Sequence, residues 1–126
     1  MKRKESNEQM VIIQWAEMNK SKYCELSLIY HVGNGGTRHI AEAANLKRQG
    51  VKPGVPDLVL PVARGGYFGL YIELKADENG KVSEHQKKWL KDLKEQGYMA
   101  GVCYGAEEAI SVIKKYLSMP KTKVCV

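Results

Sequence analysis

The sequence has 126 residues, of which 44% are hydrophobic and 27% are charged, and this composition excludes the disordered, collagen-like and coiled-coil classes. No apolar run reaches the roughly 20 residues of a membrane helix, and the basic N-terminus is not followed by the apolar stretch of a signal peptide. With a net charge of +6, we expect a domain that meets a polyanion. The three widely spaced cysteines form no C-x-x-C motif and indicate free thiols in a reducing cytoplasm.

Hydrophobic spacing and the Gly, Pro and Ser breakpoints predict helices that alternate with strands. The predicted helices cover 5–19, 37–49, 84–96 and 106–117, and the predicted strands cover 25–32, 57–62, 69–75 and 98–104. On the second helix, the residues expected to face the core are Ile40, Ala43, Ala44 and Leu46. The two central strands form a hairpin, whereas the last strand follows a helix. We therefore expect an α/β fold with a mixed central sheet flanked by helices, with one domain over 1–118 and a loose tail over 119–126.

Two acids and a lysine lie on the predicted central hairpin. Side chains alternate along a strand, so Glu73 and Lys75 share one face while Leu74 points into the core. An antiparallel hairpin brings Asp57 near Glu73, and two close carboxylates repel each other unless a divalent cation such as Mg²⁺ lies between them. This set indicates metal-assisted phosphodiester hydrolysis in which Lys75 assists the water or the phosphate charge. An ordinary Glu–Lys pair on a solvated strand face is the alternative.

Two further polar residues lie on otherwise apolar helix faces. Glu8 could complete the metal site from the first helix, and Glu5 is the less favoured candidate because it is nearer the helix end. The alternative is an acid favoured there by the helix dipole. Gln86 lies on the same stripe as Trp89, and a buried glutamine needs hydrogen-bond partners. We expect it to hold Lys75, a metal-bound water or a phosphate, or else to remain in solvent at the first turn of its helix.

The Gly-rich segment 31–38 is a candidate phosphate-binding loop. Its glycines let backbone amides approach a phosphate, Asn34 can bond to a strand end or a ligand, and Arg38 can pair with a phosphate. A simple turn between strand and helix is the alternative. The other basic residues expected to contact nucleic acid, unless they only form a solvated surface, are Lys47, Arg48, Lys52 and Lys87.

Together these segments resemble the VRR-NUC family, the virus-type replication-repair nucleases of the PD-(D/E)XK superfamily. The motifs that carry the resemblance are Glu8-Gln9, Asn34-Gly35-Gly36, Gly54-Val55-Pro56-Asp57-Leu58, Ile72-Glu73-Leu74-Lys75 and Ser83-x-x-Gln86-x-x-Trp89. They span 5–117, and their pattern is most similar to the small stand-alone members of phages and prophages.

The resemblance implies a restriction-endonuclease-like core and DNA cleavage that depends on Mg²⁺ or Mn²⁺. It makes Lys75 the catalytic lysine and Gln86 the glutamine that supports the site. The groups that it assigns to the metal are Asp57, Glu73, the backbone carbonyl of Leu74 and, as the first-helix acid, Glu8.

The resemblance also implies a homodimer that acts on branched DNA such as Holliday junctions, because a two-fold enzyme presents two active sites to two symmetric strands. Two alternatives remain. One is a DNA-binding module or partner subunit that does not cut. The other is a nuclease that acts on linear DNA or RNA.

Overall fold

The computed structural model describes residues 2–33 and 40–124, and a four-stranded sheet lies at its centre. In spatial order, the strands are β1 (Tyr30–His31), β2 (Leu58–Leu60), β3 (Leu70–Lys75) and β4 (Met99–Tyr104). The pairs β1–β2 and β2–β3 are antiparallel, whereas β4 runs parallel to β3 because a helix carries the chain back between them. The predicted mixed sheet is confirmed.

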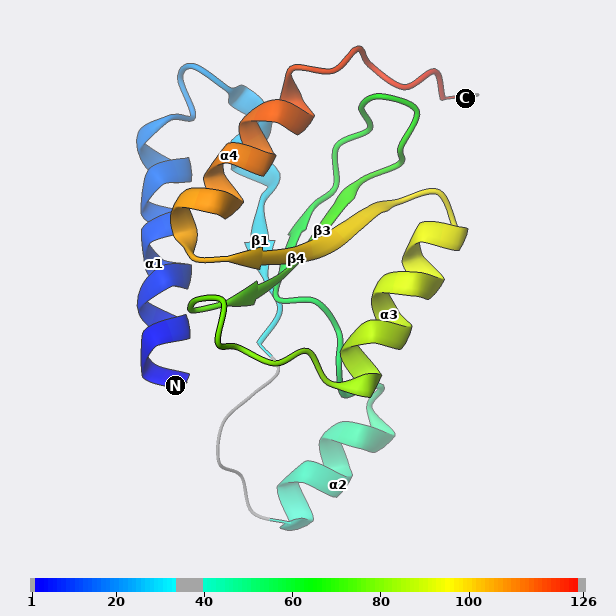
Figure 1. Ribbon diagram of the computed structural model, residues 1–126. Coiled ribbons are helices and arrows are strands. Elements are labelled where there is room, and N and C mark those ends of the chain that lie inside the picture. Colours follow the sequence, from blue (N-terminus) through cyan, green and yellow to red (C-terminus); the bar gives the residue numbers. More distant parts are fainter. Residues whose placement is uncertain (1, 34–39, 125–126) are drawn as a thin grey trace.

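Two helices cover one face of the sheet and lie side by side in Figure 1, namely α1 (Lys2–Met18) and α4 (Ala106–Leu117). Every second residue of β3 points into this layer, and these residues, each at most 2% exposed, are Leu70, Ile72 and Leu74. They share one apolar cluster with Ile12 of α1 and Ile113 of α4, both fully buried. The main core therefore lies between the sheet and the helices α1 and α4, and the intervening β3 residues face the other side of the sheet.

The opposite face is covered by α3 (Glu84–Glu95), which begins at the predicted cap. The Ser83 hydroxyl accepts a 3.1 Å hydrogen bond from the Gln86 amide, and the Gln86 side chain accepts a 2.9 Å bond from the Ser83 amide. Further along α3, Leu90 and Leu93 form a small cluster with Ala100 of β4. The first turn of α3 is therefore held next to the end of β3.

The predicted strand 25–32 is wrong over its first part. The chain there forms a short 3-10 helix, η1 (Cys24–Leu28), and only β1 pairs with β2. Leu26 is the one buried residue of η1, so the segment lacks the alternating burial that a strand would have. Glu25 is also held by an ion pair with Arg64, which favours the compact turn.

The second predicted helix packs less than expected. It is observed as α2 (Ile40–Arg48), and the start of the predicted segment lies outside the described residues. Ala43 and Ala44, expected to face the core, are exposed, and Leu46 is only half-buried. Figure 1 shows the reason, since α2 projects from the rest of the molecule and does not cover the sheet.

The predicted loose tail is held against the β2–β3 hairpin through Thr122. The Gly65 amide donates a 2.7 Å hydrogen bond to the Pro120 carbonyl, and the Thr122 hydroxyl donates a 2.7 Å bond to the Tyr67 carbonyl. The tail thus supplies partners for backbone groups of the hairpin loop. Residues 125–126 lie outside the described range.

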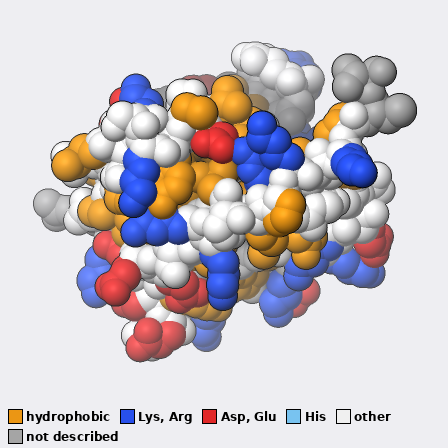
Figure 2. Space-filling model, turned by 90° about the horizontal axis from the view of Figure 1, so that it is seen from above, with side chains coloured by type: hydrophobic (Ala, Val, Ile, Leu, Met, Phe, Trp, Pro, Cys, Tyr) orange, Lys and Arg blue, Asp and Glu red, His pale blue; other side chains and the backbone are white. Residues whose placement is uncertain are grey.

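The surface of the described residues is mixed in charge. The face seen from above in Figure 2 shows Lys and Arg side chains separated by acidic and hydrophobic ones. Among the helices described, none is both long enough and apolar enough to cross a membrane.

Candidate functional site

Two carboxylates come together across the β2–β3 hairpin. The register pairs Leu58 with Ile72, which puts Asp57 opposite Glu73 on the face that α3 covers. The Leu74 amide donates a 2.7 Å hydrogen bond to Oδ2 of Asp57, so the aspartate side chain is fixed by the strand that carries the glutamate. The predicted approach of the two acids follows directly from this register.

Glu73 is the most perturbed carboxyl of the described chain. Its side chain is 3% exposed. Burial raises its pKa to about 8, together with the charge of Asp57 and a hydrogen bond to it, while Lys75 acts in the opposite direction. When both acids are ionised, neither can donate to the other, and Oε1 of Glu73 then has no hydrogen-bond partner among the described residues. The ionised pair therefore contains a buried oxygen that needs a proton or a cation.

Lys75 and Gln86 surround the other oxygen of Glu73. The Lys75 side chain is 8% exposed, and its Nζ lies 3.6 Å from Oε2 of Glu73. Nζ also donates a 3.1 Å hydrogen bond to Oε1 of Gln86, whose Nε2 donates a 3.0 Å bond to Oε2 of Glu73. The capping contacts of Ser83 fix this amide orientation, so one glutamine aligns both an ammonium and a carboxylate. The contact with Lys75, one of those predicted for Gln86, is present, and a contact with a metal-bound water or a phosphate stays a prediction.

The loops before and after the hairpin approach the site closely. A Cβ at Gly80 would lie 2.8 Å from Cβ of Lys75, so only glycine lets the loop after β3 cover the lysine stem. On the other side, Nε1 of Trp89 donates a 3.0 Å hydrogen bond to the Pro53 carbonyl. This bond ties α3 to the segment that leads into Asp57. Trp89 was part of the motif pattern, but residue types alone could not show which backbone carbonyl it reaches.

Glu8 contacts the start of α4. Its Oε1 accepts a 2.8 Å hydrogen bond from the Ala106 amide, where a helix N-terminus favours a negative charge. The preceding residue, Gly105, donates a 2.8 Å bond to the Lys75 carbonyl. Glu8 therefore joins α1 to the end of β3. The expectation that Glu8 binds the metal stays a prediction, and Oε2 is the oxygen that would do so, because Oε1 accepts from Ala106. Glu5, the less favoured candidate, lies one turn earlier on α1.

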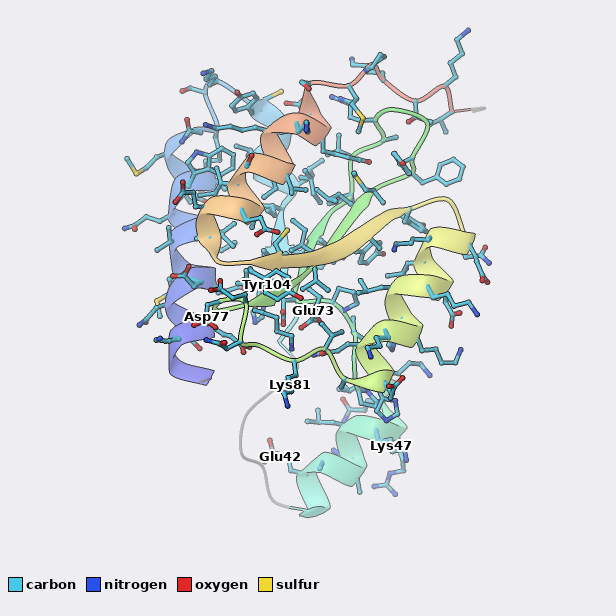
Figure 3. The ribbon with its side chains drawn as sticks, viewed as in Figure 1. Glu42, Lys47, Glu73, Asp77, Lys81 and Tyr104 are labelled. Atoms are coloured by element: carbon cyan, nitrogen blue, oxygen red, sulfur yellow. The ribbon has the colours of Figure 1, made fainter. Side chains whose placement is uncertain are left out.

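The residues predicted to contact nucleic acid are separate from the Asp57–Glu73 pair. Asn34 and Arg38 are not among the described residues, whereas Lys47, Arg48, Lys52 and Lys87 are all exposed. Lys87 is 3.6 Å from a carboxylate oxygen of Glu84. Lys81 was not predicted from the sequence. It points from the loop after β3 toward the side of the molecule where α2 and Lys47 lie (Figure 3).

The donor set fits a hard divalent cation. Within the described ranges, no three His, Cys, Asp or Glu side chains form a metal-ligating group, so the acidic site consists of Asp57 and Glu73. Mg²⁺ is commonly held by one or two carboxylates and completes its shell with waters and substrate phosphates. The buried, unpartnered Oε1 of Glu73 is the oxygen that such an ion would satisfy. The Leu74 carbonyl, on the same strand, remains a predicted third ligand.

Comparison with known proteins agrees with the fold and the motifs. A family model described as the VRR-NUC domain matches residues 2–107. A solved structure described as "VRR_NUC domain protein" is similar, with 35% sequence identity and a TM-score of 0.82, and the match covers 94% of this chain and 92% of that chain. No curated protein matches the sequence.

Proposed function

Because the chain belongs to the VRR-NUC family, we propose that it is a DNA endonuclease that depends on Mg²⁺ or Mn²⁺, with the metal held by Asp57, Glu73 and the Leu74 carbonyl. The observation that carries the proposal is the pairing of Asp57 with the buried Glu73. Glu73 has a pKa of about 8 and an oxygen without a partner when ionised, which is costly in a site with no further role. A divalent cation removes that cost.

The chain's own residues have separate tasks in this proposal. A cation bound by the acidic pair would supply Lewis-acid stabilisation of the phosphate charge. Lys75 donates to charge that develops on the phosphate and helps to orient the attacking water. Gln86 holds the ammonium at 3.1 Å and the Glu73 carboxylate at 3.0 Å, so the two charged groups keep a fixed separation. Burial of both side chains strengthens these interactions because little water screens them.

The direct test is incubation with linear duplex, flap and four-way-junction DNA at matched salt, with millimolar Mg²⁺ or Mn²⁺ or with EDTA. We expect cleavage only with the divalent ion, and none by an Asp57→Asn variant, which keeps the side-chain shape but loses the charge. Binding without cleavage by the native chain would contradict the proposal and support a non-cutting DNA-binding module.

We propose branched DNA, such as a Holliday junction, as the preferred substrate and a homodimer as the active form. Both follow from the family resemblance, and a two-fold assembly would present two sites to two symmetric strands. Preference among the three DNA forms tests the first point, and sedimentation equilibrium tests the second. Faster cleavage of linear DNA, or of RNA, would favour the alternative nuclease.

Cations at the C-terminal end of α2 are the best-placed described candidates for contacting the DNA backbone. Lys47 and Arg48 are both exposed in the last turn of a helix that projects from the molecule (Figure 1). A double variant, Lys47→Gln with Arg48→Gln, should weaken DNA binding and reduce the slope of log affinity against log salt by about two, roughly one per lost phosphate contact.

The matched control for this double variant is Lys114→Gln with Lys115→Gln, which removes two exposed lysines from the last turn of α4. Both variants remove cations from a helix C-terminus, so effects on helix stability are alike. Titrations at several salt concentrations measure the slopes. Equal slopes for the two double variants would exclude α2 as the DNA contact.

A further inference from the structure

The main-chain carbonyl of Asp57 receives two hydrogen bonds from the neighbouring strand. The Val32 amide donates to it at 2.8 Å, and Nδ1 of the His31 ring lies 2.9 Å from the same oxygen. A carbonyl oxygen only accepts, so Nδ1 of His31 must carry the proton and act as the second donor.

This contact matters because Asp57 lies just before β2 begins at Leu58 and has less strand pairing than the residues that follow. Its neighbour β1 has only two residues and forms the edge of the sheet. His31 is exposed, so burial does not fix its ring, and the bond to Asp57 is the described contact that orients it. Asp57 is thereby held at both ends, with its carbonyl fixed from β1 and its carboxylate fixed by the Leu74 amide of β3.

We infer that His31 is a positioning residue for the nuclease reaction, and that its Nδ1–H holds the backbone of Asp57 so that the carboxylate stays opposite Glu73. This inference rests on the proposed function. Groups that orient a metal-binding side chain commonly contribute 10-fold to 100-fold in metal affinity or activity. A displacement of about 1 Å in such a site is enough to reduce the rate strongly.

Substitution of His31 by asparagine or by glutamine distinguishes the role of Nδ1 from that of Nε2. In a His31→Asn variant the side-chain N–H can occupy the place of Nδ1–H, whereas in His31→Gln the amide reaches the place of Nε2 and leaves the Asp57 carbonyl without this donor. We expect His31→Asn to retain Mn²⁺ affinity and kcat within about threefold. We expect His31→Gln to lose about tenfold in both, with the KM for DNA unchanged. His85→Asn, on the exposed surface of α3, is the matched control and should behave as the wild type.

Equal losses in the Asn and Gln variants would overturn the inference, and so would a raised KM in His31→Asn, because the ring would then contact DNA directly. The tautomer of neutral His31, measured by ¹⁵N NMR of the metal-free protein, tests the bond without metal or substrate. The Nδ1–H form is expected, and the Nε2–H form would contradict the inference. If the wild type binds no Mn²⁺ and cuts no DNA while the Nδ1–H tautomer is present, the proposed function fails but the Asp57 contact stands.

Discussion

A Lys75→Met variant should cleave DNA with a kcat that is lower by about 100-fold to 1,000-fold, the loss found when one donor to transition-state charge is removed. The lysine is almost fully buried, and its Nζ is held 3.1 Å from Gln86 and 3.6 Å from Glu73. Methionine keeps a similar length and can fill the space under Gly80, where the lysine stem packs. The variant therefore removes the charge and the donor while leaving the packing nearly intact.

The measurement needs a pH at which Glu73 is ionised in both proteins. Lys75 lowers the pKa of Glu73, so its removal raises that pKa further above the present value of about 8. Single-turnover cleavage and Mn²⁺ binding should therefore be compared over pH 8 to 10. Lys115→Met, which removes an exposed lysine from the last turn of α4, is the control and should retain its activity. A Lys75→Met variant that cuts within tenfold of the wild type would show that the lysine only balances the charge of Glu73.

Much of this site could be predicted because strand geometry is regular. The alternation of side chains along 69–75 places Glu73 and Lys75 on one face with Leu74 buried behind, as observed. The hairpin then determines which residue of β2 lies opposite Glu73. The cap at Ser83 was equally visible, because a Ser followed three residues later by Gln is typical of a helix start.

Features that depend on tertiary context could not be predicted in this way. The apolar residues of 25–32 suggested a strand, but burial of Leu26 alone is satisfied by a 3-10 turn. The alanines of α2 suggested a packed face, yet small apolar residues are also favourable on an exposed helix because of their intrinsic propensity. The contact of His31 with the Asp57 carbonyl could not be predicted for a different reason. Every residue has a backbone carbonyl, and the sequence does not show which of them lies next to the histidine ring.

A Glu73→Gln variant should abolish cleavage and, in the absence of metal, make the protein more stable at alkaline pH. The folded protein raises the pKa of Glu73 from 4.5 to about 8, so folding favours the protonated carboxyl. The stability that the protonated group provides is complete below about pH 4.5 and is lost as the pH rises toward 8. Glutamine imitates the protonated acid, since its amide oxygen can accept from Gln86 and its N–H can donate to Asp57.

The difference in unfolding free energy between Glu73→Gln and the wild type should thus be near zero at pH 4.5, grow up to pH 8 and then stay constant at a few kcal/mol. Urea unfolding across this pH range in EDTA measures it, with Glu78→Gln as the exposed control. Mg²⁺ or Mn²⁺ should reverse the order, because an ion that binds only the folded wild type stabilises it in proportion to the logarithm of its concentration, while the variant gains little. A wild type that is the more stable protein at pH 9 without metal, or that gains no stability from the ion, would show that the Asp57–Glu73 pair is an ordinary structural contact.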